Sequence, residues 1–304
     1  MDKEFRNRCI ELLGSENICF QEPLSNHTSF RIGGPADIFA MPRTAGEAAD
    51  LLALCVKEKV PYFILGNGSN VLASDSGYRG VILHFGKNFS EIQIDGHEVR
   101  AQAGALLSKA ASLARDNGLS GMAFAGGIPG SIGGAVRMNA GAYGGEICQI
   151  LKQAFIVLPG EEPCWVPAEK LNLSYRHSRI ADTGELLLEA VFRLEPGDRE
   201  MIRRRMKELM EQRTSKQPLE FPSAGSTFKR PEGYFAGKLI MESGLAGFHI
   251  GDARVSEKHC GFVINTGQAT AKDVYSLILE VSRRVKALHG VALEPEICFL
   301  GDMG

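Results

Sequence analysis

Residues Gly121–Gly145, GMAFAGGIPGSIGGAVRMNAGAYGG, are rich in glycine: nine of these 25 residues are glycine, against 35 among all 304. The stretch shows neither alternating nor heptad hydrophobicity, yet it is too apolar to be a solvated linker. Glycine serves where the backbone needs a positive φ or where another group must approach the main chain closely. The stretch therefore predicts main chain wrapped around a large flat or phosphorylated ligand. The alternative is a buried loop whose glycines only permit tight helix packing.

A second glycine loop, Gly66-Asn67-Gly68-Ser69-Asn70, follows the short apolar segment Tyr62–Leu65. Such glycines let successive backbone N–H groups point to one side and form an anion site. The loop is neither a GxGxxG motif that opens a helix nor a Walker loop. It is a candidate pyrophosphate cradle, with a plain turn as the alternative. Because Ile128–Gly134 repeats the pattern, the two loops together could hold the two ends of one dinucleotide.

The overall composition is that of an ordinary globular protein, with 44% hydrophobic residues and a net charge of −2. This charge argues against nucleic acid or a membrane surface as a partner. No apolar run reaches the ~18 residues of a membrane span, and the charged N-terminal segment lacks the apolar core of a signal peptide. Seven scattered cysteines without CxxC spacing disfavour a metal site or a disulfide framework and favour the cytoplasm.

Hydrophobic periodicity and turn signals predict an α+β chain. Helices are expected at residues 3–14, 44–59, 106–117, 198–213, 235–243 and 271–289. Strands are expected at residues 62–65, 80–85, 91–94, 98–103, 150–158, 164–166, 186–194, 261–264 and 293–300. Pro196-Gly197 interrupts the pattern after a strand, so a domain boundary is placed there.

Six motifs occur in the order NHTSFRIGGPA, ILGNGSNVL, GGIPGSIGGAVRMNAGAYGGE, LSYRHSR, PSAGSTFKRP and LEPEI. Together they closely resemble the UDP-N-acetylenolpyruvoylglucosamine reductase (UDP-N-acetylmuramate dehydrogenase) family, flavoenzymes of peptidoglycan synthesis. The resemblance covers about residues 20–300. The first three motifs are shared more loosely with FAD-binding folds of the vanillyl-alcohol-oxidase type. The last three are specific to the reductases.

The resemblance implies an FAD-binding fold of two α+β subdomains followed by an α+β substrate-binding domain. In this chain the implied parts are an N-terminal helix and lead-in (1–25), an FAD-binding domain (26–196) and a substrate-binding domain (197–304). The C-terminal tail is expected to return to the active site. No tyrosine-bearing insertion occurs between Arg176 and Ser226, as in the shorter subclass of these enzymes.

The resemblance also implies non-covalent FAD held by the two glycine loops. The implied cofactor-binding residues are Gly66, Asn67, Gly68, Ser69, Asn70, Gly127, Ile128, Pro129, Gly130, Ser131, Gly133, Gly134, Asn139, Gly141 and Tyr143. Asn139, Gly141 and Tyr143 are expected nearest the flavin ring.

Three residues are implied to be catalytic: Arg176, Ser226 and Glu296. Arginine is the natural bidentate partner of a carboxylate, such as that of an enolpyruvyl group. A serine hydroxyl can protonate a carbanionic centre when its neighbours polarise it. A glutamate can assist that step if burial raises its pKa. The alternatives are a surface salt bridge for Arg176, a turn serine for Ser226 and an exposed acidic turn for Glu296.

Arg176 is also implied in binding the substrate carboxylate, and Lys216 in binding the substrate diphosphate. Lys229 and Arg230 are further candidates for phosphate contacts, and His259 is a substrate-binding candidate with an open role. The chain departs from the family pattern at Arg230, where asparagine is frequent, and near His259, where some relatives have glutamine. Cys298 stands where an arginine is common, which puts one phosphate or carboxylate contact in doubt.

The implied reaction passes a hydride from NADPH through FAD to UDP-N-acetylglucosamine enolpyruvate and yields UDP-N-acetylmuramate. The expected partners are therefore small molecules, and the expected oligomeric state is a monomer. Two alternatives differ in class. One is an FAD-linked oxidase of the same fold that reduces oxygen, and the other is a non-catalytic nucleotide-binding protein.

Overall fold

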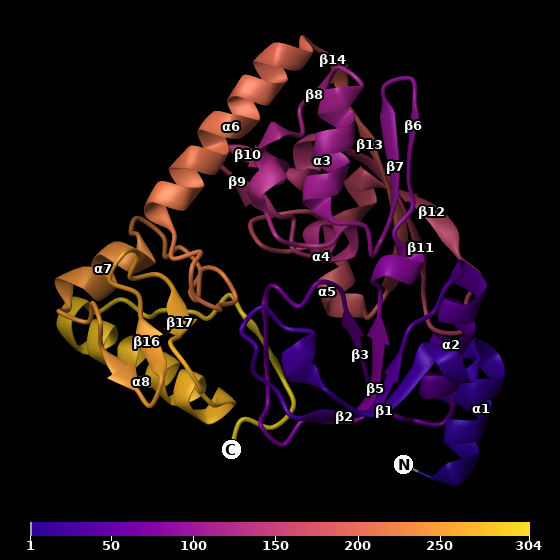
Figure 1. Cartoon of the computed structure of the whole chain (residues 1–304), viewed down its shortest axis with the longest axis horizontal. Coiled ribbons are helices and arrows are strands. Elements are labelled where there is room, and N and C mark those ends of the chain that lie inside the picture. Colours follow the sequence, from indigo (N-terminus) through magenta and orange to yellow (C-terminus); the bar gives the residue numbers. More distant parts are fainter. Residues whose placement is uncertain (1) are drawn as a thin grey trace. The chain divides into compact units, whose positions relative to one another are not determined.

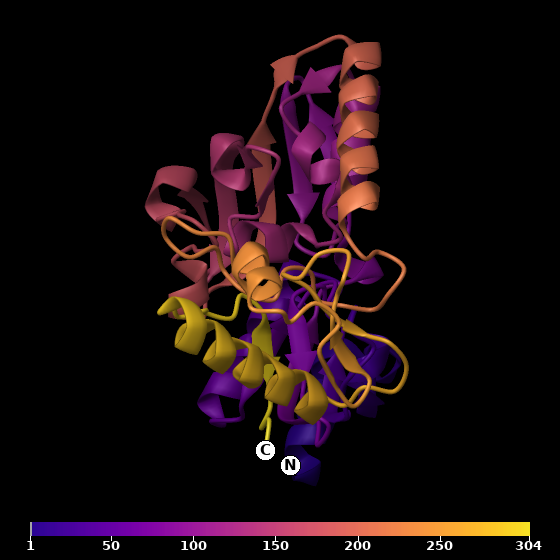
Figure 2. The same ribbon diagram turned by 90° about the vertical axis from the view of Figure 1, so that its left-hand side faces the viewer.

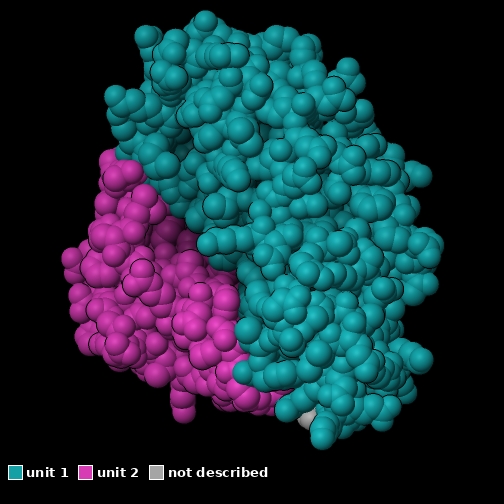
Figure 3. Space-filling model, turned by 45° about the vertical axis from the view of Figure 1, so that its right-hand side comes forward, with its two compact units in different colours: residues 1–20, 38–67, 80–213 teal, residues 21–37, 68–79, 214–304 magenta. Residues whose placement is uncertain are grey.

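The computed structural model describes residues 2–304, which form two compact units (Figure 3). The first unit comprises the chain up to Phe20 together with Ile38–Asn67 and Gly80–Arg213. The second comprises Gln21–Asp37, Gly68–Arg79 and Thr214–Gly304. The chain therefore enters the second unit three times. One of these crossings lies inside the glycine loop at residues 66–70, between Asn67 and Gly68.

One part of the first unit is built on a four-stranded sheet with the order β1-β2-β5-β3 (Figure 1). Its strands are β1 (Ile18–Pro23), β2 (Pro35–Ala40), β3 (Tyr62–Leu65) and β5 (Tyr78–His84), and its helices are α1 (Lys3–Leu13) and α2 (Ala45–Lys57). Strands β1, β2 and β5 each have residues in both units, because the boundaries between the units fall within them. The Thr44 side chain accepts a hydrogen bond from Glu47 N and so begins α2. Strand β3 pairs parallel with β5. Its last residue, Leu65, directly precedes the glycine loop.

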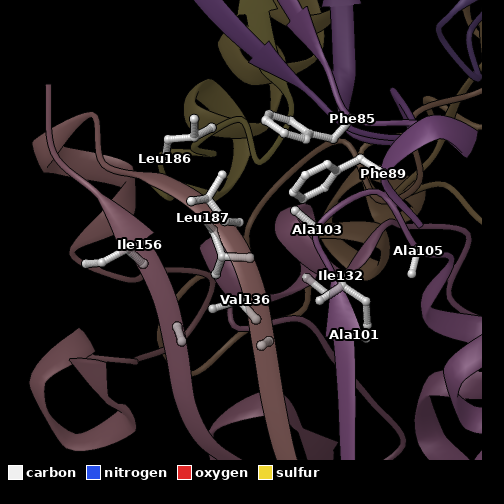
Figure 4. Close-up of a cluster of buried hydrophobic side chains, with 14 of the residues drawn as sticks. Phe85, Phe89, Ala101, Ala103, Ala105, Ile132, Val136, Ile156, Leu186 and Leu187 are labelled. Carbon is white, nitrogen blue, oxygen red and sulfur yellow. The ribbon is translucent and has the colours of Figure 1, made fainter. Parts of the chain in front are cut away.

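The other part of the first unit is a five-stranded antiparallel sheet with the order β12-β11-β13-β7-β6. Its strands are β6 (Ile92–Asp95), β7 (Glu98–Gln102), β11 (Leu151–Val157), β12 (Cys164–Pro167) and β13 (Leu186–Arg193). Helix α4 (Ile132–Arg137) packs Ile132 and Val136 among buried sheet residues such as Ala101 and Ile156 (Figure 4). This apolar contact fixes the position of the residues that precede α4, which belong to the second glycine loop.

The glycine-rich stretch itself contains three short elements. They are the 3₁₀ helix η4 (Ala123–Gly127), α4, and a hairpin of β9 (Gly141–Ala142) and β10 (Gly145–Glu146). Its apolar side chains, among them Phe124, lie in the core of the first unit. The stretch therefore does pack tightly, as the alternative interpretation expected, while residues 126–130, from the end of η4 towards α4, stay partly or fully exposed. The unit also contains α3 (Leu107–Asp116), α5 (Ile180–Thr183) and the short pair β8 (Leu119–Ser120) and β14 (Glu195–Pro196).

Helix α6 (Arg199–Lys216), the long helix in Figures 1 and 2, packs on η4. A Cβ atom placed at Gly126 would lie 2.7 Å from Cε of Met206, so the helix packs directly on this glycine. The boundary expected after residue 196 therefore falls inside the first compact unit, because α6 stays packed there as far as Arg213. The assignment of residues 26–196 to FAD binding and 197–304 to substrate binding stays a prediction.

The second unit combines a three-stranded sheet, a parallel strand pair and two helices. The sheet has the order β15-β16-β17, and β18 pairs parallel with β4. The elements are β4 (Val71–Ala73), β15 (His249–Ile250), β16 (Ala253–Val255), β17 (Val263–Asn265), β18 (Cys298–Leu300), α7 (Ala236–Glu242) and α8 (Ala271–His289). A capping box of Thr270 and Asp273 begins α8, and Gly290 with φ +71° ends it. Asp75 also accepts hydrogen bonds from Ala271 N and Lys272 N, which ties the β4 loop to α8.

The α+β prediction is confirmed, and the expected long helices are present. The C-terminal tail differs from the prediction, since only Cys298–Leu300 of the expected strand at 293–300 is a regular strand. Pro295 has no N–H to donate, and it forms only an isolated bridge with Phe228. Within the described residues, no helix is both long and apolar enough to cross a membrane.

Candidate active site

The two glycine loops meet within the first unit. The Asn67 side chain donates from Nδ2 to the carbonyl oxygen of Pro129. A Cβ atom at Gly66 would lie 2.1 Å from Oγ of Ser131, so a side chain at position 66 would force Ser131 to move. Ser131 is buried, and its Oγ accepts from Gly134 N as the cap of α4. The structure thus brings together two loops that are separated by about sixty residues, as the sequence predicted.

These loops present backbone donors that the protein does not use. Among the described residues, the amides of Gly66, Asn67, Gly130 and Ser131 donate to no protein acceptor. Neighbouring amides without acceptors form a site for an anion such as a pyrophosphate. The donor set of the first unit therefore fits the phosphate portion of a dinucleotide.

The Asn139 side chain is almost fully buried, with 1% exposed, and its amide bonds within the protein. Its Nδ2 donates to Glu146 Oε2 at 3.1 Å and to Ser174 O at 3.0 Å, and its Oδ1 accepts from Cys148 N at 2.8 Å. Asn139 therefore connects the β9–β10 hairpin to the turn at Ser174. Its predicted contact with the flavin stays a prediction.

Arg176 lies in that turn. Ser174 and His177 exchange backbone hydrogen bonds of 3.0 and 3.1 Å, and Arg176 between them has φ +56°. Its Nη2 donates to the carbonyl oxygen of Gly141 at 3.3 Å. The predicted catalytic arginine and the predicted flavin-side residue Gly141 are thus in direct contact.

Arg213 is a candidate that the sequence interpretation missed. Its Cδ would lie 3.2 Å from a Cβ atom at Gly127. Burial lowers the pKa of its guanidinium, and nearby Tyr143 partly offsets that effect. No ion pair holds Arg213 among the residues that the structure describes. Along the sequence it resembles the many surface arginines of α6, so no local signal distinguished it.

Ser226 and Glu296 lie close together in the second unit. The bridge between Phe228 and Pro295 places Glu296 N at 2.8 Å from the carbonyl oxygen of Thr227, the neighbour of Ser226. Ser226 follows Gly225, whose φ is +77°, and its Oγ donates to Phe228 O at 3.3 Å. Two predicted catalytic residues that are seventy positions apart are therefore held on adjacent backbone segments.

The Thr227 side chain fixes this arrangement to the sheet of the second unit. Its Oγ1 accepts from Val263 N at 2.9 Å, and its backbone N donates to Gly261 O at 2.8 Å. The position of Ser226 is thus set by strand β17 rather than by a mobile loop end.

Apart from Arg176, which belongs to the first unit, the predicted substrate contacts lie in the second unit but have different surroundings. Lys229 already pairs with Glu294, whereas Lys216 is exposed at the end of α6. Arg230 lies 4.0 Å over the ring of Phe235. Burial lowers the pKa of His259, and its Nδ1 accepts from Gly261 N at 3.1 Å. A neutral imidazole that accepts at Nδ1 carries its proton on Nε2, which can then donate to a ligand.

Two family models match this chain. The family model "FAD binding domain" matches residues 36–165, a range that includes both glycine loops. The family model "UDP-N-acetylenolpyruvoylglucosamine reductase, C-terminal domain" matches residues 217–300, which include Ser226 and Glu296.

Full-length relatives carry the same name. The chain is 48% identical to the UDP-N-acetylenolpyruvoylglucosamine reductase of Clostridium tetani, over 99% of this chain and 97% of that protein. It is 49% identical to the reductase of Clostridium novyi, over 97% of this chain and 96% of that protein.

Solved structures give the same result for the fold. The UDP-N-acetylenolpyruvylglucosamine reductase (MurB) from Thermus caldophilus matches with a TM-score of 0.80 and 34% identity, covering 93% of this chain and 98% of that one. An alkyldihydroxyacetonephosphate synthase matches with a TM-score of 0.50 and 16% identity, covering 64% of this chain and 42% of that one. The second match shows a shared fold alone.

Proposed function

The chain belongs to the UDP-N-acetylenolpyruvoylglucosamine reductase family, and we propose below how its own residues carry out the reaction. It is an FAD-containing oxidoreductase of peptidoglycan synthesis that reduces enolpyruvyl-UDP-N-acetylglucosamine. Membership of this family decides against the oxidase and the non-catalytic binding protein. The proposal adds NADPH as the hydride donor, the roles of individual residues, and a monomeric enzyme of the cytoplasm that acts on small molecules.

FAD is proposed to lie on the main chain of Gly66–Asn70 and of the loop formed by Gly127–Ser131, Gly133 and Gly134. The support is the contact between Gly66 and Ser131 and the unused amides beside it. Asn139, Gly141 and Tyr143 are proposed on the side of the flavin ring. Bound there, FAD would supply the hydride-transfer chemistry that reduces the vinyl CH₂ carbon of the substrate.

Arg176 is proposed to bind the carboxylate of the enolpyruvyl group. Its guanidinium is oriented by the bond to Gly141 O and by the tight turn around it. As negative charge develops on the carbon that bears the carboxylate, a fixed guanidinium stabilises that charge more in the transition state than in the ground state. Lysine cannot reproduce the bidentate geometry.

Ser226 is proposed to give its hydroxyl proton to that carbon, while the carboxyl group of Glu296 hydrogen-bonds the enolate oxygen. The single observation that carries this assignment is the backbone bond between Glu296 N and Thr227 O, which holds the two residues on neighbouring segments. Protonation by a positioned side chain contributes about 10²–10⁴-fold to a rate. Lys216, Arg230 and the Nε2–H donor of His259 are proposed to bind the UDP portion. Lys229 would bind the UDP portion only if its ion pair with Glu294 were replaced by one with a phosphate group.

The test is the oxidation of NADPH by the yellow, FAD-containing protein in the presence and absence of UDP-N-acetylglucosamine enolpyruvate. We expect rapid oxidation only when the enolpyruvyl substrate is present, together with formation of UDP-N-acetylmuramate. Flavin that NADPH reduces but that the substrate fails to reoxidise would contradict the proposal. A clear preference for NADH would contradict only the choice of donor.

A further inference from the structure

One asparagine of the glycine loop bonds to the main chain of Glu296 and of Cys298, two residues further on. The side chain of Asn70 donates from Nδ2 to the carbonyl oxygen of Glu296 at 3.1 Å. The backbone carbonyl oxygen of Asn70 accepts from Cys298 N at 2.9 Å. All three residues belong to the second unit. We propose that Asn70 is a positioning residue that aims the Glu296 carboxyl group, and this inference rests on the role proposed for Glu296.

The strand register explains why an amide is needed at position 70. Strand β4 begins at Val71, which lies opposite Cys298, the first residue of the parallel strand β18. Glu296 therefore lies beyond the end of the ladder, where the backbone of Asn70 cannot reach its carbonyl. The side-chain amide supplies that bond and extends the ladder past its last backbone pair. Aspartate or alanine at position 70 would leave the carbonyl without this donor.

Glu296 is consequently held at both of its backbone polar groups. Its N–H donates to Thr227 O at 2.8 Å, on the segment that carries Ser226, and its carbonyl accepts from Asn70. The backbone of Glu296 is thus fixed from two sides. A loss of the Asn70 bond lets the backbone at residue 296 shift, and a shift of 1 Å at a reacting group can cost about 10²-fold in rate.

The competing interpretation is that Asn70 serves the cofactor, as the sequence suggested for the whole loop. The two roles differ in which half of the reaction they affect. A cofactor ligand changes FAD retention and the reduction of the flavin by NADPH. A positioning residue for Glu296 changes only the reoxidation of the reduced flavin by the enolpyruvyl substrate.

The experiment uses the FAD-containing full chain and follows both half-reactions by stopped-flow absorbance. Asn70→Ala and Asn70→Asp are expected to retain FAD and to be reduced by NADPH within about twofold of the unmodified rate. Reoxidation by substrate is expected to slow by roughly tenfold to a hundredfold. Thr266→Ala is the control, because it also removes a side-chain donor to a backbone carbonyl, that of Asp252, in the same unit. It is expected to leave both half-reactions unchanged.

A double-mutant cycle with Glu296→Ala then asks whether Asn70 acts through Glu296. When one residue acts through another, the effects of their substitutions on the rate are not additive. Asn70→Ala should therefore slow reoxidation less than about threefold in the Glu296→Ala background. An equal loss in both backgrounds would overturn the inference and leave the proposed function standing. Loss of FAD from both Asn70 variants would also overturn it, and would assign Asn70 to the cofactor. If Glu296→Ala alone reoxidises normally, the role proposed for Glu296 fails instead.

Discussion

The contact between the two glycine loops can be tested with one methyl group. In Gly66→Ala the new Cβ would lie 2.1 Å from Ser131 Oγ and 3.2 Å from Ser131 Cβ. An ordinary contact begins at 3.4 Å, so the methyl group and the hydroxyl must separate by about 1.3 Å. The φ angle of Gly66 lies outside the left-handed region, so the cost is steric and not conformational.

Ser131 has only two ways to move aside. If its hydroxyl rotates, α4 loses its cap, which costs about 0.5–2 kcal/mol. If the loop moves instead, the unused amides of Gly66 and Ser131 move relative to one another. We therefore expect Gly66→Ala to lower the free energy of unfolding by about 1–2 kcal/mol and to weaken FAD binding by about tenfold or more.

The assay is a titration of the apoprotein with FAD, followed by quenching of flavin fluorescence, together with thermal unfolding of the apoprotein. Gly46→Ala is a matched control in the same unit, because its nearest new contact is 3.9 Å away and it lies in helix α2. This control should raise stability by up to about 1 kcal/mol. Ser131→Ala should partly rescue Gly66→Ala, since the closest contact then becomes 3.2 Å. Unchanged FAD affinity and unfolding in Gly66→Ala would refute the proposed contact.

Four further outcomes are expected. Ser226→Ala should keep its FAD and its reduction by NADPH but lose about 10²–10⁴-fold in reoxidation by substrate; normal turnover in a steady-state assay would remove the serine from the mechanism. Asn139→Ala should lower the thermal midpoint and slow substrate-driven reoxidation, because the turn that carries Arg176 loses its anchor at Ser174; a shift in the midpoint alone would make Asn139 purely structural. Arg213→Met should raise the KM for substrate or weaken FAD, because it removes a half-buried cation beside Gly127 and Tyr143; kinetics and FAD affinity that match the parent would exclude that role. Because the pKa of His259 is lowered in the folded chain, the unfolded chain takes up this proton at a higher pH than the folded chain. Stability should therefore fall as the pH drops below about 6.5, and His259→Gln should flatten that fall in thermal melts at pH 5–7.

Much of this protein can be predicted from local sequence. The two glycine loops, the caps of α2 and α8 and the periodicity of the long helices depend on residues that are close along the chain. The motifs around Arg176, Ser226 and Glu296 likewise carry the family resemblance, which the full-length relatives confirm. Residue type and spacing are sufficient here because backbone geometry and capping are short-range effects.

What the sequence by itself determined was therefore the α+β class, the family and the set of chemically capable residues. The tertiary structure alone decided which of these residues bind one another. Asn70 reaches Glu296 only because β4 and β18 are parallel and in a particular register, and a side chain at position 66 would force a shift only because Ser131 lies against it. Asn139 turns inward to Ser174, and Arg213 differs from the other arginines of α6 only by what it packs on. Such contacts join residues that are far apart along the chain, so they depend on strand register and helix packing, which no local pattern encodes.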